Sequence, residues 1–282
     1  MSEKHLSADD IRETERSEWA ARGNAWDRWA DRMAPLADRL NAPLLDAAGI
    51  AAGQSVLDLA SGAGEPALTI ARRVGPSGSV TATDLVPEML AGARRRAAGI
   101  GNIRFELADM TALPFAPASF DRVTCRFGLM FAPDPLAALR EARRVLRPGG
   151  IAAFMVWGPI ENNTNFVVID GVAKRLLNRS FFDRPIHPFR FAAAGALTPL
   201  LQEAGFAAAK ESELGFAPKV EVGTPFWRSG VDMMLDDRLA SLDAAARAAF
   251  DQAVETAFSP HRAGDHYQLH SHVRIAVGRT QA

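Results

Sequence analysis

The sequence predicts an α/β fold in which a parallel sheet is covered by helices on both faces. Between Gln54 and Trp157, short apolar segments of strand length alternate with longer segments of helical periodicity. Charged residues also stand at the carboxyl ends of several expected strands, which is where open α/β sheets bind ligands. A chain of 282 residues with a hydrophobic share of 48% is long enough for one large domain with an insertion.

The alternation places each element of this region. We expect strands at Ser55–Leu59, Ser79–Asp84, Ile103–Leu107, Phe120–Arg126 and Ile151–Trp157, and helices at Pro66–Val74, Pro87–Ala98 and Pro135–Leu146. Pro66 is suited to the first turn of its helix, because its missing N–H would have no partner there.

The rest of the chain is expected to complete the sheet and cover it. After Trp157 we expect an irregular and then helical stretch at 158–191, a helix at 194–204 and a strand at 207–214. A helical insertion at 224–235, a helix at 240–258 and a last strand at 272–277 follow.

The turn after the first expected strand has the composition of a ligand site. Asp58 lies within the strand, and Gly62 and Gly64 follow it, before Pro66 begins a helix. The glycines let the backbone approach a ligand closely, and the helix points its free N–H groups at the same place. This arrangement is typical of nucleotide-type ligands.

The spacing of this turn also fits the dinucleotide pattern G-x-G-x-x-A, with Asp84 about twenty residues further on. Charge distinguishes the alternatives, because Asp58 and Glu65 would repel a pyrophosphate but suit an ammonium or sulfonium group. Asp84 suits a ribose diol, and the helix N-terminus suits a carboxylate. S-adenosylmethionine carries all of these groups, while an NAD(P)-dependent oxidoreductase remains the alternative.

From Ala51 to Trp157 the chain resembles class I S-adenosylmethionine-dependent methyltransferases, nearest to the branch with the ubiquinone and menaquinone biosynthesis enzymes and related bacterial small-molecule enzymes. The matching features are D-x-x-x-G-x-G at Asp58, Gly62 and Gly64, the acid Asp84, the pair Asp109-Met110 and the turn at 146–150. Ala60 departs from the pattern, since relatives often have glycine there.

The resemblance implies a Rossmann-like, doubly wound, mostly parallel seven-stranded sheet with an antiparallel last strand and a helical lid. It divides the chain into an N-terminal helical flap (1–50), a cofactor-binding core (51–157) and a C-terminal part with substrate-roof insertions (158–282). The residues it implies for S-adenosyl-L-methionine are Asp58, Ala60, Ser61, Gly62, Gly64, Asp84, Leu85, Asp109, Met110 and Arg126.

Aromatic and apolar residues near this core suggest where a methyl acceptor binds. We assign substrate contacts to Trp26, Trp29, Phe127, Met130 and Phe131, with ordinary core packing as the alternative for each. The stretch from Arg126 to Phe131 lacks the Asn/Asp-Pro-Pro-Tyr/Phe signature of enzymes that methylate nucleobase amines. The expected acceptor is a small, partly apolar molecule, aromatic, quinone-like or polyketide-like, methylated at O, C or N.

Methyl transfer needs few protein groups, because the sulfonium is already activated and alignment supplies much of the rate. A base is required only if the nucleophile arrives protonated. His187 is the candidate base, since it lies in the expected roof segment and imidazole titrates near neutrality. A structural or surface histidine is the alternative.

The remaining composition excludes several classes of partner. A net charge of −1 gives no reason to expect nucleic acid, and the one basic triplet, Arg94–Arg96, is expected on a solvated helix face. The single cysteine, Cys125, is expected to be a buried structural thiol, and no metal site is expected.

No apolar stretch approaches the roughly twenty residues of a membrane span, and residues 1–10 are polar, so a cytoplasmic protein is expected. Homo-oligomerisation is left open, as is a protein that binds the cofactor without turnover.

Overall fold

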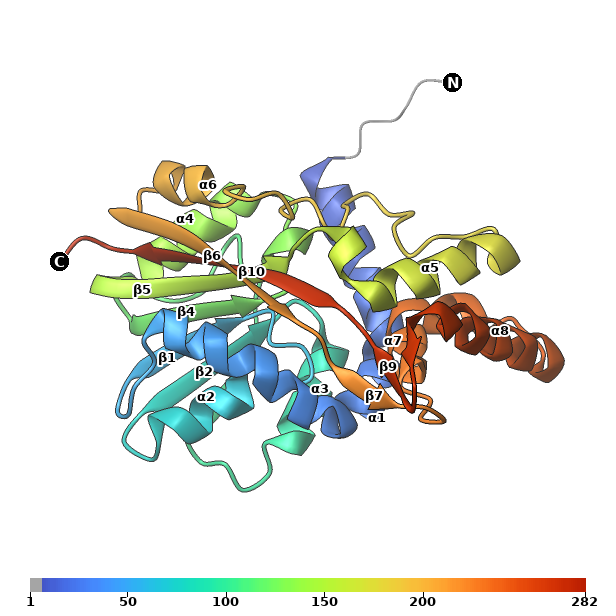
Figure 1. The fold of residues 1–282 in the computed structure, drawn as a ribbon. Coiled ribbons are helices and arrows are strands. Elements are labelled where there is room, and N and C mark those ends of the chain that lie inside the picture. Colours follow the sequence, from blue (N-terminus) through green and yellow to red (C-terminus); the bar gives the residue numbers. More distant parts are fainter. Residues whose placement is uncertain (1–6) are drawn as a thin grey trace.

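A seven-stranded sheet organises the chain in the computed structural model, which describes residues 7–282 (Figure 1). Its strand order is β3-β2-β1-β4-β5-β10-β6, and β10 runs antiparallel to both of its neighbours while the other pairs are parallel. The strands are β1 (Ser55–Leu59), β2 (Ser79–Asp84), β3 (Ile103–Leu107), β4 (Phe120–Arg126), β5 (Leu146–Trp157), β6 (Ala208–Phe216) and β10 (Ser271–Arg279). The predicted fold class, including the antiparallel last strand, is confirmed.

The first four strands begin and end at the predicted residues. The fifth differs, because β5 begins at Leu146 rather than Ile151. Leu146 pairs with Phe120 of β4, and the register then shifts before the pairing resumes. The turn sequence at 147–150 is therefore incorporated into the strand as an irregularity, which the glycine and proline signals disguised.

Helices cover the two faces of the sheet with separate apolar clusters. The second half of α1 and α2 pack on one face, and α4 and α6 pack on the other. The helices are α1 (Ala8–Ala48), α2 (Ala67–Val74), α3 (Pro87–Arg96), α4 (Pro135–Val145) and α6 (Thr198–Glu203), with a 3-10 turn, η1, at Leu129–Phe131. The helix predicted at 194–204 is shorter than expected, since its first residues form turns.

The N-terminal region is one helix of 41 residues, begun by a capping box between Ser7 and Asp10. Its last turns bury Leu40, Leu44 and Leu45 against the sheet, so this half of α1 belongs to the core. Its first half continues past this core, and Arg12 near its start reaches Asp109 after β3. The expected polar residues 1–6 lie outside the described part of the chain.

The insertion forms a second layer with its own apolar cluster. Its helices are α5 (Thr164–Leu177), α7 (Trp227–Leu239) and α8 (Ala244–Ala257), with 3-10 turns η2 (Ile160–Asn162) and η3 (Ser259–His261). A small sheet accompanies them, in the order β7 (Lys219–Glu221), β9 (His266–Gln268) and β8 (Arg262–Ala263). The sequence did not indicate these strands, which are too short to show a period. The expectation at 158–191 holds at its start, where a short segment with η2 precedes α5, but it was wrong for the residues after α5, which are irregular rather than helical.

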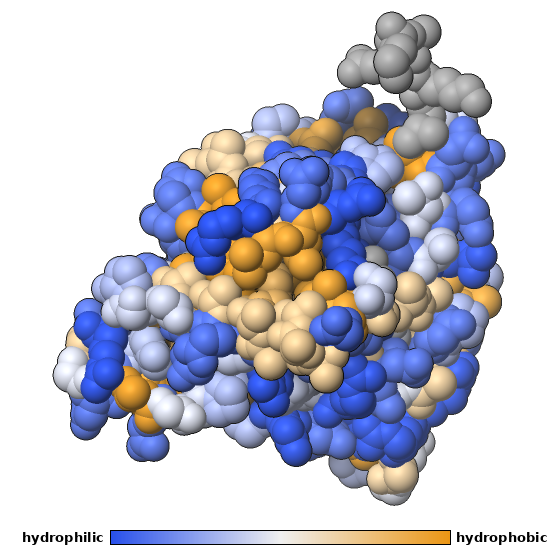
Figure 2. All heavy atoms as spheres, turned by 90° about the vertical axis from the view of Figure 1, so that its right-hand side faces the viewer, coloured by the Kyte–Doolittle hydropathy of each residue, from blue (hydrophilic) through white to orange (hydrophobic). Residues whose placement is uncertain are grey.

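The insertion also forms one face of the molecule. Figure 2 shows apolar residues gathered on the side of α5 and α8, with polar residues around them. Val167 and Leu176 of α5 are 46% and 48% exposed there. A groove lined by Arg175, Ala249, Gln252, Ala253, Thr256 and Ala257 separates the two helices.

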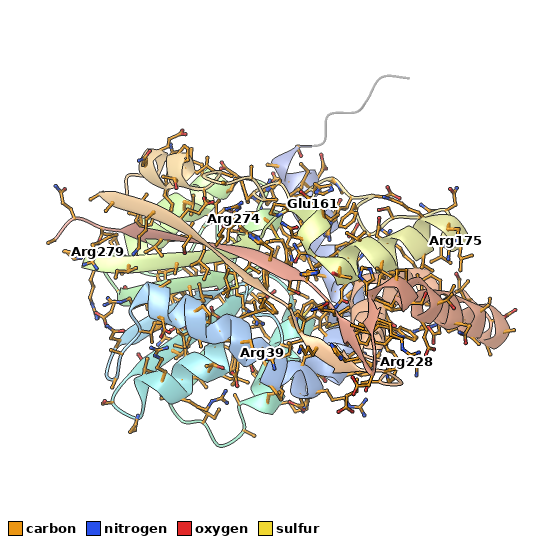
Figure 3. All side chains as sticks on the ribbon, viewed as in Figure 1. Arg39, Glu161, Arg175, Arg228, Arg274 and Arg279 are labelled. Carbon is orange, nitrogen blue, oxygen red and sulfur yellow. The ribbon has the colours of Figure 1, made fainter. Side chains whose placement is uncertain are left out.

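A buried arginine holds the segment before α6 against the sheet. Arg274 lies on β10 in Figure 3, where the labelled Arg175 and Arg228 belong to α5 and α7 of the insertion. Its Nε donates to the carbonyl of Ala192 at 2.6 Å, and its Nη1 lies 3.4 Å from a carboxylate oxygen of Glu213. The return from the insertion to the sheet is therefore fixed by hydrogen bonds as well as by strand pairing.

We predict that Phe154→Ala lowers the free energy of unfolding by about 3–5 kcal/mol, because it opens a cavity in the centre of the sheet. Phe154 is 1% exposed on β5, whereas Leu107 at the end of β3 is 57% exposed. Leu107→Ala is the control and should change stability by about 0.5 kcal/mol or less. Urea unfolding measures both. Similar losses in the two variants would contradict this position of the core.

Candidate active site

The glycine turn and the acid that ends β2 meet directly. The Gly62 N–H donates to Oδ2 of Asp84 at 2.9 Å, and the Ser61 N–H donates to the carbonyl of Thr83 at 2.8 Å. Gly62 has a φ of 54°, and a Cβ added there would touch nothing within 4 Å. This position therefore favours glycine for its backbone conformation and leaves open space above the turn.

Asp58 is a fully buried carboxylate between two central strands. Its Oδ1 accepts a hydrogen bond from Oγ1 of Thr124 on β4 at 2.6 Å. Its Oδ2 is buried and has no hydrogen-bond partner among the described residues. Burial raises the pKa of Asp58 to about 7, although the Thr124 hydroxyl and the Arg126 guanidinium oppose the rise.

Asp84 is also buried, and its burial raises its pKa to about 6. The backbone N–H groups of Gly62 and Val86 donate to its two oxygens and limit that rise. Both oxygens retain lone pairs for further donors. Asp58 and Asp84 thus lie at neighbouring strand ends, in an environment that favours an added cation or hydrogen-bond donor.

Two further buried polar atoms near these acids lack a partner within the part of the chain that is described. They are Oγ of Ser61 in the glycine turn and Nε of Arg126 at the end of β4. Nη2 of Arg126 reaches only the Glu65 carbonyl, at 3.4 Å. A donor or acceptor left unpaired inside a protein costs about 1–3 kcal/mol, so such a group is expected to serve a ligand.

Glu65 does not have the role expected from its charge. Its carboxylate accepts from Nη2 of Arg96 at 2.9 Å and from Nδ2 of Asn41 at 2.8 Å. It is therefore paired within the protein rather than free to face a cation. The expectation of a solvated Arg94–Arg96 triplet was also wrong for Arg96, whose side chain is 5% exposed.

Asp109, which the resemblance places in the cofactor site with Met110, is joined by Arg12, a residue that the sequence analysis did not indicate. Oδ1 of Asp109 accepts from the backbone N–H and the hydroxyl of Thr111, both at 2.8 Å. Its Oδ2 lies 2.6 Å from Nε of Arg12, near the start of α1. Leu85 and Met110 are half-buried beside these strand ends. The start of α1 thus covers the end of β3.

The apolar residues after β4 separate into a half-buried part and a fully buried part. Phe127 has a φ of 60°, which is unusual for a bulky residue, and its ring stacks on Trp157 at 4.0 Å. The Trp157 ring contacts that of Phe166 on α5 at 4.9 Å. Met130 is fully buried in the core beneath them. This position agrees with core packing, the alternative to a substrate contact for this residue.

A second residue with a positive φ lies after the neighbouring strand β1. Ala60 also has a positive φ of 51°, and its Cβ lies 2.3 Å from where a Cβ on Gly128 would stand. A side chain at Gly128 would displace Ala60 and the turn that follows it. Backbone strain held in this way is found at ligand sites.

The predicted aromatic residues of α1 face different neighbours. Trp29 donates from Nε1 to Oδ2 of Asp232 on α7 at 2.9 Å, which fixes the helix to the insertion. Trp26 lies 6.1 Å from Trp19, whose ring meets that of Phe131 at 4.9 Å. Phe131, Trp19 and Trp26 are thus brought together, whereas Trp29 is separated from them.

His187 is exposed in the irregular segment after α5 and stacks on Phe182 at 5.1 Å. Its Nδ1 accepts from the Phe189 N–H at 3.2 Å, and partial desolvation of the ring by its neighbours lowers its pKa. A neutral imidazole that accepts at Nδ1 carries its proton on Nε2. The outward nitrogen is then a donor, so this geometry does not supply the free lone pair of a base.

Three other expectations concern chemistry outside the turn. Cys125 is buried, and burial raises the pKa of its thiol to about 12, as expected for a structural cysteine. Within residues 7–282 no group of three or more His, Cys, Asp or Glu side chains is placed to hold a metal ion. None of the helices described is long and apolar enough to cross a bilayer.

Comparison with known families identifies the core. The model of a methyltransferase domain family matches residues 56–150, from the first strand into the start of β5. Residues 56–150 form a methyltransferase domain. The methyltransferase domain contains the glycine turn, Asp58, Asp84, Asp109 and Arg126, so the predicted resemblance is confirmed over this region.

Curated relatives match a similar length of chain. A ubiquinone/menaquinone biosynthesis C-methyltransferase from Hahella chejuensis is 46% identical over 109 residues, or 38% of this chain and 44% of the relative. A demethylmenaquinone methyltransferase from Staphylococcus aureus is 40% identical over 103 residues, or 36% of this chain and 43% of the relative. The chain therefore matches less than half the length of these relatives.

Solved structures extend the likeness in fold. A methyltransferase-like protein from Bacillus halodurans has a TM-score of 0.55 at 22% identity, covering 86% of this chain and 99% of that one. A [4+2]-cyclase has a TM-score of 0.53 at 22% identity, covering 87% and 81%. Similarity at this level shows the fold alone, and the fold hosts more than one reaction.

Through Asp58, the ligand-free protein loses stability as the pH rises from about 5 to about 8. We predict that Asp58→Asn makes this loss smaller by about 1–3 kcal/mol. Burial raises the pKa of Asp58 in the folded protein to about 7, from an ordinary value of about 3.8. The unfolded chain therefore releases this proton first, and rising pH favours unfolding through this group until both states are ionised.

Urea unfolding at the two pH values measures the effect. Glu161→Gln, which removes an exposed carboxylate labelled in Figure 3, is the control and should retain the parent pH dependence. An Asp58→Asn variant that tracks the parent at both pH values would show that the folded protein does not hold this proton.

Proposed function

We propose that the protein is an S-adenosyl-L-methionine-dependent methyltransferase acting on a small, partly apolar aromatic acceptor. The observation that carries the proposal is the set of buried polar atoms without partners among the described residues, Asp58 Oδ2, Ser61 Oγ and Arg126 Nε, at the strand ends of the methyltransferase domain. In an amino-acid ligand, the ammonium group would donate to Asp58 Oδ2, and the carboxylate would accept from Arg126 Nε and from the Ser61 hydroxyl.

The residues present fit the rest of the cofactor as well. The Asp84 carboxylate would accept from the ribose hydroxyls, and Asp109 would accept from the adenine amine beside Leu85 and Met110. Gly62 and Gly64 would let the turn approach the ligand, with Ala60 behind it. Arg12, which now pairs with Oδ2 of Asp109, would share or yield that oxygen when adenine binds.

The acceptor would be held by aromatic rings. When bound, the cofactor supplies an activated methyl group for in-line displacement, so the protein needs chiefly to align the acceptor and exclude water. Phe127, Trp157 and Phe166 provide stacking surfaces between the strand ends and α5. Two relatives are named for quinone biosynthesis, which favours a quinone-like ring over a sugar.

Two alternatives keep part of this assignment. An NAD(P)-dependent oxidoreductase would place a pyrophosphate against the turn, where the Asp58 carboxylate disfavours it electrostatically. A protein that binds the cofactor without methyl transfer is favoured by the [4+2]-cyclase that shares the fold. Titration with both cofactors and a search for transferred methyl label separate these functions.

We predict that Asp84→Ala weakens binding of S-adenosylmethionine by about 2–4 kcal/mol, because two charge-assisted hydrogen bonds to the ribose are lost. Ser61→Ala should weaken binding while leaving stability of the free protein unchanged or raised, because its hydroxyl is buried and has no partner within residues 7–282. Asp46→Asn, with a side chain 64% exposed, is the control. Calorimetry that finds parental affinity in both site variants would refute this cofactor site.

We predict that His187→Ala lowers turnover by less than about tenfold, whereas loss of a general base lowers it by about 10²–10⁴-fold. Acceptors are first found by screening aromatic metabolites with methyl-labelled cofactor, and turnover is then followed across pH. A larger loss that recovers as the acceptor ionises would instead establish His187 as the base, through its other tautomer.

A further inference from the structure

The second turn of α1 brings an arginine to the acid that the proposed function assigns to adenine. Nε of Arg12 lies 2.6 Å from Oδ2 of Asp109, in the loop that follows β3. Neither the spacing of the cofactor motifs nor the resemblance to methyltransferases includes Arg12. Tertiary structure alone therefore places this side chain at the cofactor site.

Asp109 has one oxygen left for a ligand. Its Oδ1 accepts from the backbone N–H and the hydroxyl of Thr111, both at 2.8 Å, and these bonds fix the carboxylate. Among residues 7–282, Oδ2 has the ion pair with Arg12 as its only polar contact. A ligand amine that binds Asp109 must therefore approach Oδ2, next to Arg12.

Arg12 has a donor that this ion pair does not use. Nε is close to Oδ2, but its N–H is not directed at that oxygen and has no hydrogen-bond partner in the described part of the chain. On the other side of the guanidinium, Nη1 pairs with Asp9 of the preceding turn. Buried donors in proteins are nearly always paired, so the Nε–H indicates a missing acceptor.

The pair lies at the surface of the protein, where a ligand can reach it. The side chains of Arg12 and Asp109 are 32% and 24% exposed. In α1, the described residues before Arg22 include one buried residue, Glu15. The start of the helix is therefore held by side-chain contacts rather than by a core, and rotation of the long Arg12 side chain uncovers Nε with little loss of packing.

An acceptor and a donor side by side match the edge of adenine. The exocyclic amine of adenine is a donor, and the ring nitrogens N1 and N7 on its two sides are acceptors. Asn and Gln side chains bind adenine in DNA through the same combination, accepting from the amine and donating to N7. Here Oδ2 of Asp109 supplies the acceptor and Nε of Arg12 supplies the donor.

We propose that Arg12 determines the recognition of adenine, by donating from Nε to a ring nitrogen beside the amine while Asp109 accepts from the amine itself. The proposal rests on the proposed function for the position of the cofactor. A hydrogen bond from a guanidinium is charge-assisted, so it contributes to affinity as well as to the choice of base. The first turns of α1 would then bind the cofactor directly, besides covering it.

The test uses S-adenosylhomocysteine and its 1-deaza and 7-deaza analogues, each of which replaces one ring nitrogen by a C–H group. Calorimetry on the full chain should show that the parent binds at least one analogue about tenfold or more weakly than S-adenosylhomocysteine. Arg12→Met keeps a long unbranched side chain but has no donor. It should bind S-adenosylhomocysteine about tenfold more weakly than the parent and lose the preference for it over one of these analogues.

Arg16→Met is the matched control. Arg16 lies one turn further along α1, has a side chain 43% exposed and pairs with Glu13 of the same helix. The control removes a cation from the same surface of the helix without touching Asp109, so it should bind all three ligands as the parent does.

The ratio of affinities separates recognition from a purely structural role. If Arg12 only holds α1 in place, Arg12→Met weakens all three ligands equally and keeps the parental ratios, which would overturn the proposal. Tighter binding of S-adenosylhomocysteine by this variant would also overturn it, because Arg12 would then compete with adenine for Asp109. If Arg12→Met does not fold, Arg12→Lys keeps the charge but has no N–H at the position of Nε. The same preference should then fall, and parental ratios in Arg12→Lys would contradict the proposal.

The two proposals fail separately. A parent protein that does not bind S-adenosylhomocysteine refutes the proposed function. A parent that binds it and discriminates against neither analogue retains the cofactor site and refutes the role of Arg12.

Discussion

The buried guanidinium of Arg96 is the interaction on which the site depends. Its Nη1 donates to the carbonyl of Ala63, its Nη2 to the Glu65 carboxylate and its Nε to Asp31 of α1. One side chain on α3 thereby fixes both the glycine turn and the long N-terminal helix. Because the turn must lie within hydrogen-bond distance of Asp84, this positioning sets the geometry that any ligand meets.

The site is built from polar groups that the protein itself leaves unsatisfied. Asp58, Ser61 and Arg126 hold buried atoms without partners among the described residues, and Phe127 holds a strained backbone conformation beside them. Such features reduce the stability of the free protein. The packed cores on both faces of the sheet offset this loss. A ligand that forms hydrogen bonds with these atoms recovers the free energy lost by leaving them unpaired. The groups that lower the stability of the free protein are therefore the groups that favour binding.

The long helix α1 joins the two layers of the protein. Its second half is part of the sheet's core, whereas its first half carries Arg12, Glu15 and Trp19 over the strand ends. Trp29, between these parts, is bonded to α7 of the insertion. The cover of the site is therefore attached to the core and to the insertion at once, and its position follows from both.

The sequence alone determined the parallel strands β1 to β4 and the glycine turn, because these depend on local signals. Alternating apolar segments defined β1 to β4 at both ends, and the charge of the turn around Asp58, Gly62 and Gly64, with its resemblance to methyltransferases, indicated the methyltransferase domain. Only the tertiary structure decided which charges are free. Glu65 and Arg96 are far apart in sequence and neutralise each other, and Arg184 pairs with Glu15 of α1 beside rings from α1 and from the turn after β4. Pairing of charges depends on distances between residues that are remote in the chain, and no local pattern contains those distances.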